Sequence, residues 1–203
     1  MKDHWNHIYK NTPLERLGWY ESNLNPTVRL IEQTQLSKGA RILNVGAGTT
    51  TLIDELIKMG YYNLLATDIS DVALNMLNAR LGKNSIEIIV DDITNPSKLN
   101  RIKPIDLWID RAVLHFFTRK KGRKTYFSLV NKLLKPGGHI LFAQFNIKSA
   151  KKCSGLPVYR YNKAMLHENL SNEFKLIDSF DYNFVMPSGD LRTYVYALFK
   201  RQL

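Results

Sequence analysis

Short runs of apolar residues alternate with segments whose apolar residues recur at helical spacing along most of the chain. The runs predict strands, which we place over residues 41–45, 63–67, 86–90, 105–109 and 139–145. The helical spacing predicts helices, which we place over residues 26–36, 52–57, 73–81 and 126–134. Short strands that alternate with helices form a parallel sheet covered on both faces, so the pattern predicts an α/β fold.

Two of these helices have a local signal at one end. Ser70 precedes the helix over 73–81 and is a residue type that caps helix N-termini. Lys135-Pro136-Gly137-Gly138 follows the helix over 126–134 and cannot continue it, so we expect that helix to stop there.

The last quarter of the chain departs from this alternation. We predict a short helix over 163–170 and strands over 175–182 and 191–199. Residues 183–190 are too few to form the crossover that parallel neighbours need. The two strands are therefore expected to form an antiparallel hairpin at the edge of the sheet.

A glycine-rich turn follows the first strand. Residues Asn44-Val45-Gly46-Ala47-Gly48-Thr49 lead from that strand into a helix, which brings main-chain N–H groups beside any ligand in the crevice. Asp68, followed by Ile69, ends the next strand about twenty positions later, where a carboxylate can accept both hydroxyls of a ribose. The spacing therefore predicts a ligand that contains a nucleoside.

The turn matches the fingerprint of nicotinamide dinucleotide binding only in part. Thr51 stands where that fingerprint has a third glycine. After the third strand, the Asp91 side chain and the main chain at Asp92 or Ile93 can bind an adenine amino group. A nicotinamide-dependent oxidoreductase remains an alternative, but it needs room for a second nucleotide.

Composition narrows the class of protein. With 203 residues and 44% hydrophobic content, the chain is expected to form a single domain over residues 1–203. It has no apolar run near the roughly 18 residues of a membrane span and no apolar signal segment, so we expect a soluble, cytoplasmic protein. Cys153 is the only cysteine, and the absence of zinc-ligand spacing indicates no metal.

The net charge of +11 keeps a nucleic-acid-binding module as an alternative, although no such module is recognisable and nucleic acid is the less favoured partner.

Over residues 15–200 the chain resembles the class I S-adenosylmethionine-dependent methyltransferases. The glycine motif corresponds to residues 44–48, the ribose acid to Asp68 and the adenine segment to residues 91–93. The resemblance implies S-adenosylmethionine as cofactor and S-adenosylhomocysteine as product. It also implies a Rossmann-like seven-stranded sheet of order 3-2-1-4-5-7-6, with strand seven antiparallel. Asn44 departs from the family, which usually has an acidic residue there.

The same resemblance implies that residues 1–25 form a lid over the cofactor. Trp19 and Tyr20 lie in this segment. Their rings can shield the sulfonium from water and attract it through their π faces. Plain packing in the core is the alternative.

Three segments, residues 17–21, 108–116 and 152–161, are similar to a bacterial group of small methyltransferases that resemble the citrate-synthase lysine methyltransferase of mitochondria. The first part of the second segment also resembles thiopurine S-methyltransferases. The resemblance favours a protein lysine or a small amine as acceptor. A thiol or another small nucleophile is the alternative.

Three residues after the fourth strand are candidates for a role in methyl transfer to the acceptor. This reaction requires that the methyl donor and the acceptor be aligned at about 3 Å and that the acceptor atom has lost its proton. Asp110 can orient or deprotonate the acceptor and is also expected to contact the cofactor, or it can instead cap the turn that follows or pair with Arg111. Arg111 can clamp the carboxylate of the cofactor or of an acidic acceptor, or form an ion pair. His115 can accept a proton, or pack in the core.

Two groups of basic residues follow the fourth and fifth strands. They comprise residues 119–124 and Lys148, Lys151 and Lys152. At the ligand-binding edge they can attract an acidic acceptor or an acidic protein surface. The alternative is that these basic residues only form a solvent-exposed face of the protein. Cys153 lies beside them without an evident activating partner, which argues against a nucleophilic role.

Overall fold

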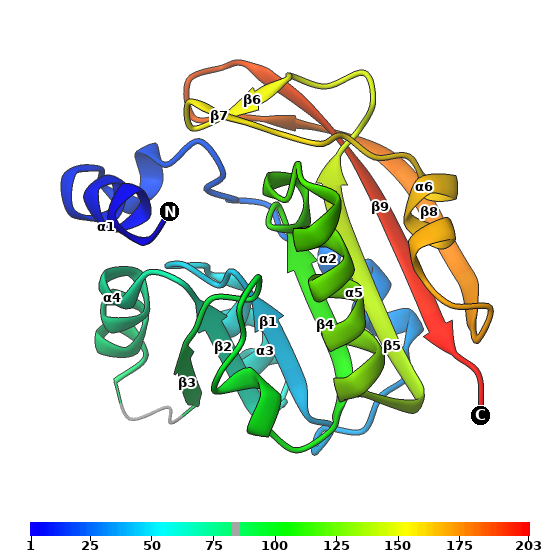
Figure 1. Ribbon diagram of the computed structural model, residues 1–203. Helices are drawn as coiled ribbons and strands as arrows, with labels where there is room; N and C mark the ends of the chain where they lie inside the picture. The colour runs from blue at the N-terminus through cyan, green and yellow to red at the C-terminus, as the bar shows by residue number, and fades with distance from the viewer. Residues whose placement is uncertain (83–85) are drawn as a thin grey trace.

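The computed structural model describes residues 1–82 and 86–203, which include a seven-stranded sheet with helices on both faces (Figure 1). The sheet order is β3-β2-β1-β4-β5-β9-β8. Its strands are β1 (Ile42–Val45), β2 (Leu64–Asp68), β3 (Glu87–Val90), β4 (Ile105–Arg111), β5 (Leu134–Phe145), β8 (Phe174–Val185) and β9 (Leu191–Arg201).

The pairing pattern confirms the predicted topology. Strands β3, β2, β1, β4 and β5 are parallel to one another, whereas β9 is antiparallel to both β5 and β8. A separate two-stranded hairpin, β6 (Lys152–Cys153) and β7 (Leu156–Pro157), precedes β8 in the chain. Strands β8 and β9 therefore correspond to strands six and seven of the predicted order.

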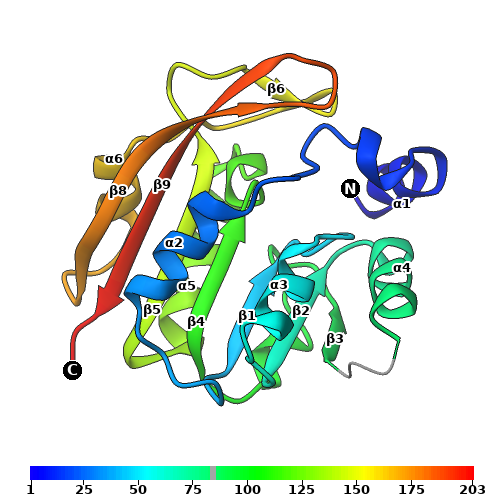
Figure 2. The ribbon, with the colours of Figure 1, turned by 180° about the vertical axis from the view of Figure 1, so that it is seen from behind.

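The helices cover the two faces of this sheet. They are α2 (Asn25–Gln33), α3 (Leu52–Lys58), α4 (Asp71–Leu81), α5 (Lys120–Leu133) and α6 (Lys163–Asn169). Leu43 of β1 packs in one core with residues of α5 and α6, whereas its neighbour Ile42 packs in a second core with residues of α2, α3 and α4. Successive residues of a strand point to opposite faces, so β1 contributes to both cores. Figure 2 shows α2 and α3 on the face away from α5.

The two predicted helix ends have different outcomes. Ser70 caps α4, because its Oγ accepts a hydrogen bond from the Ala73 N–H at 3.1 Å. The expected stop after residue 134 was one step late: α5 ends at Leu133, and β5 begins at Leu134 and runs through the Pro-Gly-Gly segment.

An N-terminal helix, α1 (Lys2–Asn11), was not predicted. It packs on α4 beyond the carboxyl ends of β1 and β2 (Figure 1). Asn6 joins the two helices, since its amide donates to Asp71 at 2.8 Å and accepts from the Ser70 hydroxyl at 2.6 Å. Trp5, Ile8 and Tyr9 recur at helical spacing, and this signal could have identified the helix.

Within residues 1–82 and 86–203, no helix combines the length and the apolar character required to cross a membrane.

Candidate active site

A cavity of about 660 Å³ lies at the carboxyl ends of β1, β2 and β4, beneath α1. Open parallel sheets bind ligands at this edge, beside the point where the strand order reverses. In this sheet that point lies between β1 and β4. The volume is within the range of cavities that hold nucleotide-sized ligands.

The glycine turn forms part of the cavity wall through Gly46. Both Gly46 and Gly48 have left-handed backbone conformations, with φ of 58° and 52°. A Cβ atom would lie 2.0 Å from Val113 Cγ2 at Gly46 and 2.2 Å from Tyr9 Oη at Gly48. Glycine is therefore required here because the β4 loop and α1 approach the turn closely.

Other residues of the predicted motif lie behind this wall. Asn44, Ala47 and Thr49 are buried and do not line the cavity. Their contribution is to the packing of the turn. Direct ligand contact from this segment is therefore expected mainly from the main chain at Gly46.

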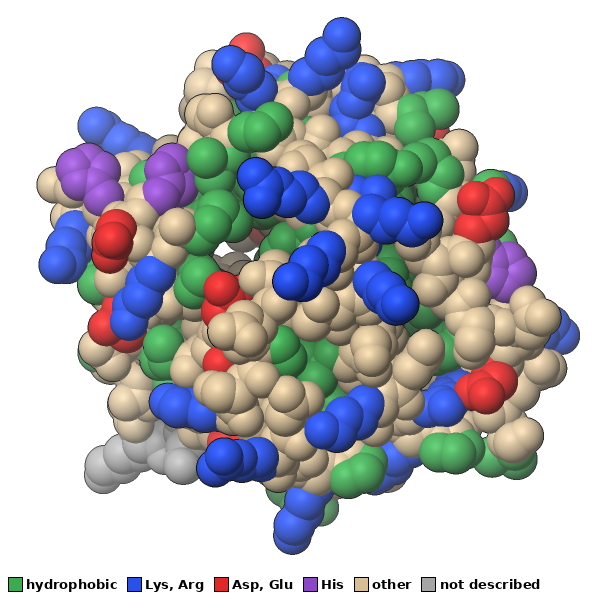
Figure 3. Space-filling view, viewed as in Figure 1, with side chains coloured by type: hydrophobic (Ala, Val, Ile, Leu, Met, Phe, Trp, Pro, Cys, Tyr) green, Lys and Arg blue, Asp and Glu red, His purple; other side chains and the backbone are tan. Residues whose placement is uncertain are grey.

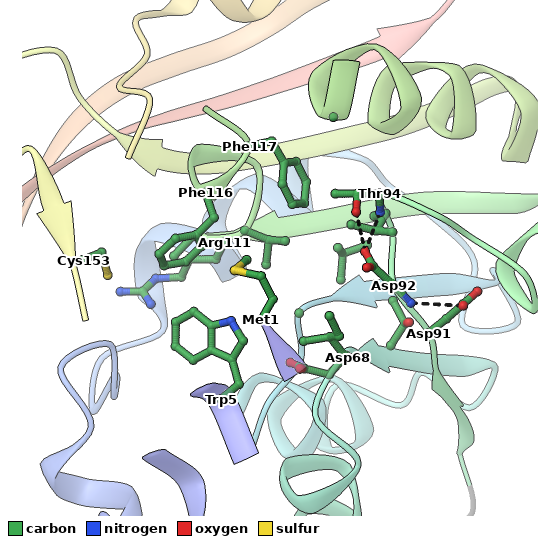
Figure 4. A pocket seen from close by; sticks show the side chains of 18 of the residues that line it. Met1, Trp5, Asp68, Asp91, Asp92, Thr94, Arg111, Phe116, Phe117 and Cys153 are labelled. Atoms are coloured by element: carbon green, nitrogen blue, oxygen red, sulfur yellow. Dashed lines mark hydrogen bonds between the residues drawn. The ribbon is translucent and has the colours of Figure 1, made fainter. Parts of the chain in front are cut away.

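Asp68 reaches the cavity from the end of β2, and Ile69 lines it beside Asp68 (Figure 4). Oδ2 accepts a hydrogen bond from the Gly48 N–H and Oδ1 accepts one from the Ser70 N–H, each at 2.8 Å. Each oxygen retains a further lone pair for a hydroxyl donor. Burial raises the pKa of Asp68 to about 6, and this effect outweighs that of the main-chain hydrogen bonds, which lower the pKa by favouring the ionised form.

The adjacent acids after β3 have different environments. The Asp91 carboxylate accepts hydrogen bonds from the N–H groups of Asp92, Ser97, Lys98 and Leu99 and from the Ser97 hydroxyl. It holds the following loop together, which corrects the expectation that its side chain is available to adenine. Figure 4 shows this carboxylate directed away from Asp68.

Asp91, Asp92 and Ile93 all line the cavity, but the Asp92 carboxylate is less committed to its own loop than that of Asp91. Oδ1 of Asp92 accepts from the N–H and hydroxyl of Thr94 at 2.8 and 2.7 Å. Its Oδ2 receives no hydrogen bond from the described part of the chain. We therefore transfer the proposed contact with the adenine amino group from Asp91 to Asp92.

The structure does not support the predicted acceptor-activating role of Asp110. Its side chain is fully buried and does not line the cavity. The carboxylate accepts from the N–H groups of Val113 and Leu114, from the Tyr126 hydroxyl and from the Gln144 amide. Asp110 therefore caps the turn after β4, which was the alternative interpretation.

Arg111 lines the cavity and forms a buried ion pair with Glu21, with 2.9 Å between Nε and Oε1. Its Nη1 also donates to the Trp19 carbonyl at 3.0 Å. The guanidinium lies over the rings of Phe184 and Tyr194. Nη2 is buried without a hydrogen-bond partner among the described residues, so it remains available to an anionic group of a ligand.

His115 is fully buried and does not line the cavity. It packs edge-on against Phe116 and in a tilted contact with Phe145. Burial and the nearby Arg111 charge lower the pKa of His115 to about 3, so the ring is neutral at physiological pH. The predicted role in proton transfer to or from the acceptor is thus not supported, and His115 is a core residue.

Cys153 of the β6–β7 hairpin lines the cavity near Arg111 (Figure 4). Burial raises the pKa of its thiol to about 11. The thiol therefore remains protonated at neutral pH, in agreement with the argument against a nucleophilic role.

Aromatic rings form the side of the cavity under α1. Trp5 makes edge contacts with Trp19 and Phe116, at centroid distances of 5.5 and 5.1 Å. Tyr9 contacts Trp19 in the same way at 5.8 Å. Tyr20, which was predicted together with Trp19, is half-buried and does not line the cavity.

A family model described as "Methyltransferase domain" matches residues 42–138, from β1 into β5. Together with the sheet order and the site, this match defines the class of protein. The chain is a class I S-adenosylmethionine-dependent methyltransferase.

The chain is similar to EEF1A lysine methyltransferase 2 of Danio rerio, with 27% identity over 161 residues that cover 71% of this chain and 68% of that protein. Its fold is similar to that of a methyltransferase from Anabaena variabilis, with a TM-score of 0.79, 13% identity and coverage of 99% of this chain and 93% of that chain. It is also similar to the N-methyltransferase NodS from Bradyrhizobium japonicum in complex with S-adenosyl-L-homocysteine, with a TM-score of 0.76, 16% identity and coverage of 98% and 97%.

Proposed function

We propose that this enzyme transfers a methyl group to an amine, and specifically to a lysine side chain of a protein. The printed name of the relative from Danio rerio supports a lysine acceptor. The aromatic wall of Trp5, Trp19 and Phe116 is the structural observation that carries the proposal. Such rings fit the apolar stem of a lysine and attract the positive charge that the methylated nitrogen gains.

The residues around the cavity suit S-adenosylmethionine. The Asp68 carboxylate, with free acceptor capacity in a largely apolar cavity, would hold the ribose hydroxyls. Asp92 and the main chain at Ile93 would hold the adenine, and the main chain at Gly46 would lie beside the methionine portion. When bound, the cofactor supplies a methyl group whose bonding pair returns to sulfur as the acceptor nitrogen donates its lone pair to carbon.

The described cavity wall offers no dedicated base for the acceptor. Asp110 and His115 are buried outside the wall, and Asp68 is assigned to the ribose. The Arg111 guanidinium disfavours a second positive charge nearby and so favours the neutral form of an amine. The proposed role of the protein is therefore to accept an amine that has already lost its proton, to exclude water and to align it.

The test is transfer of radiolabelled methyl groups from S-adenosylmethionine to a cell extract, with parallel samples treated with protease or ribonuclease. The Asp68→Ala variant serves as the inactive control, because it lacks the ribose acceptor. Protease-sensitive label recovered as methyl-lysine after hydrolysis is the expected result. Label confined to small molecules would favour the alternative of a thiol or other small nucleophile, and ribonuclease-sensitive label would overturn the protein acceptor.

A further inference from the structure

Charge is unevenly distributed along the chain. Residues 111–167 contain 13 of the 29 basic residues and none of the 18 acidic residues. This segment begins at the end of β4 and includes α5, β5 and the β6–β7 hairpin. It contributes Arg111, Lys121 and Cys153 to the cavity wall, whereas all the acids lie elsewhere in the sequence.

Six exposed cations of this segment border the mouth of the cavity, and we call them the basic rim. They are Arg119, Lys120, Lys121, Lys124, Lys151 and Lys152. The rim comes from two segments beside the same cavity, the start of α5 with the residue before it and the β6–β7 hairpin with the residue before it. The cavity is lined by Thr118 and Lys121 of the first region and by Cys153 of the second. Figure 3 shows basic side chains along one side of the hollow.

None of the six rim cations forms an ion pair within the part of the chain that the structure describes. Two nearby arginines differ, because they bind main-chain carbonyls of the segments beside the rim. Arg123 donates to the carbonyls of Phe117 and Thr118, and Arg160 donates to those of Ile147 and Ser149. The rim thus presents uncompensated charge on the start of α5 and on the β6–β7 hairpin, beside segments that these arginines hold in place.

We propose that the basic rim docks an acidic surface of the protein acceptor, so that the enzyme selects a lysine surrounded by Asp and Glu residues. This inference rests on the proposed function. Opposite charges steer encounter and fix the orientation of the partners. A lysine among carboxylates is held in its protonated form, and pairing those carboxylates with the rim would weaken that effect and favour the neutral amine.

The composition of the rim favours a protein over a nucleic acid. Five of its six residues are lysines, whereas arginine is the side chain that binds phosphate in a bidentate manner. Single-stranded nucleic acids also need exposed rings for base stacking. The Tyr159 ring near the rim is covered by Arg123, with 4.1 Å from the guanidinium carbon to the ring centroid. Ile147, by contrast, is 44% exposed nearby and suits an apolar contact in a protein interface.

The test compares two triple variants of equal net charge. The rim variant is Lys120→Glu, Lys124→Glu and Lys151→Glu, which leaves every cavity-lining residue intact. The matched control is Lys103→Glu, Lys175→Glu and Lys200→Glu, which changes exposed lysines outside the basic segment. Calorimetry with S-adenosylhomocysteine verifies that both variants bind the cofactor product like the wild type.

Methylation of extract proteins is then measured at low and high salt. At low salt we expect the methylation rate of the rim variant to be about tenfold or more below that of the wild type, which is in the range of electrostatic steering. The rate of the control variant should stay within about twofold of the wild-type rate. The wild-type rate should fall with added salt and that of the rim variant should change little. Mass spectrometry should find acidic residues around the modified lysines.

The outcomes separate the docking inference from the proposed function. Equal rates for the rim and control variants, with wild-type protein methylation intact, would overturn the docking inference alone. No methylation of protein by the wild type would overturn the proposed function and the docking inference with it. Replacement of the same three rim lysines by Gln should give an intermediate rate, and a wild-type rate there would also contradict charge-based docking.

Discussion

Tyr126 of α5 donates its hydroxyl hydrogen bond to the carboxylate of Asp110, and both side chains are fully buried. Trp108 Nε1 in turn donates to the Tyr126 hydroxyl at 2.9 Å. This chain of hydrogen bonds fixes the turn after β4 to the helix behind it. The acid at the tip of β4 therefore acts on the shape of the cavity without contacting the acceptor.

Replacement of Asp110 should destabilise the protein. Asp110→Ala removes the acceptor of four hydrogen bonds, from Val113, Leu114, Tyr126 and Gln144, and each buried donor left unsatisfied costs about 1–3 kcal/mol. We expect the free energy of unfolding in urea to fall by at least about 3 kcal/mol. Tyr126→Phe, which removes one donor, should cost less. An Asp110→Ala variant of wild-type stability that had lost only turnover would instead restore the catalytic interpretation.

The affinity for S-adenosylhomocysteine should fall as the pH drops below about 6. The Asp68 carboxyl has a pKa of about 6 in the free protein because burial disfavours its charge. Ribose hydroxyls stabilise the ionised form, so binding is strongest above this pKa and weakens by up to about tenfold per pH unit below it. Calorimetry from pH 5 to pH 8 measures this change.

The Asp68→Asn variant is the control for this pH dependence. Asp110 also has a raised pKa, of about 6, but it does not line the cavity. The variant should bind more weakly and show a nearly flat profile over the same range. A wild-type profile as flat as that of the variant would argue against the ribose role of Asp68.

Replacing one partner of the buried ion pair between Arg111 and Glu21 should destabilise the fold more than replacing both partners with apolar residues. Glu21→Gln leaves the guanidinium without a countercharge, which for a buried pair costs about 3–5 kcal/mol. The double variant Glu21→Leu with Arg111→Met should recover part of that loss. Urea unfolding of Glu21→Leu, Arg111→Met and the double variant gives the coupling energy, and additive losses would contradict the coupling.

Loosening α1 should weaken binding of S-adenosylhomocysteine. Asn6→Ala removes both hydrogen bonds that join α1 to the start of α4. We expect a severalfold or greater rise in Kd, because the loss of about 1 kcal/mol per hydrogen bond weakens the docking of α1, which carries Trp5 and Tyr9 of the cavity wall. Asn11→Ala is the matched control, since within the described residues the Asn11 side chain forms hydrogen bonds only with His7 of the same helix. Equal Kd values for the two variants would exclude this role of Asn6.

The strand order of the sheet was implied by the family resemblance. Its parallel part and its edge hairpin were predictable from the sequence itself, because strands, crossovers and hairpins each leave a length and spacing signal. Asp68 was predictable for the same reason, as it ends a strand beside the glycine turn. Burial was harder to predict. Asp91 and Asp92 are neighbours of the same type, yet the Asp91 carboxylate binds the following loop through both oxygens, whereas Asp92 accepts hydrogen bonds from the described residues through Oδ1 alone. Asp110 and His115 turn inward because of contacts with Gln144 and Phe145, which are distant in sequence.

The aromatic wall was predicted only through Trp19. Trp5 and Tyr9 belong to a helix whose short apolar stripe was overlooked. Their place in the cavity wall depends on the docking of that helix to α4 through Asn6. A contact between two helices far apart in the sequence produces no local sequence pattern, so the docking of α1 on α4 could not be predicted.

The two faces of α5 are subject to different constraints. Its inner face carries Tyr126, whose hydroxyl is committed to Asp110, whereas Lys120 and Lys124 on the same helix are exposed. Substitutions on the outer face can therefore accumulate without disturbing the turn that shapes the cavity. An enzyme built in this way can acquire new acceptors during evolution by exchanging surface charges, while its methyl-transfer chemistry is inherited unchanged.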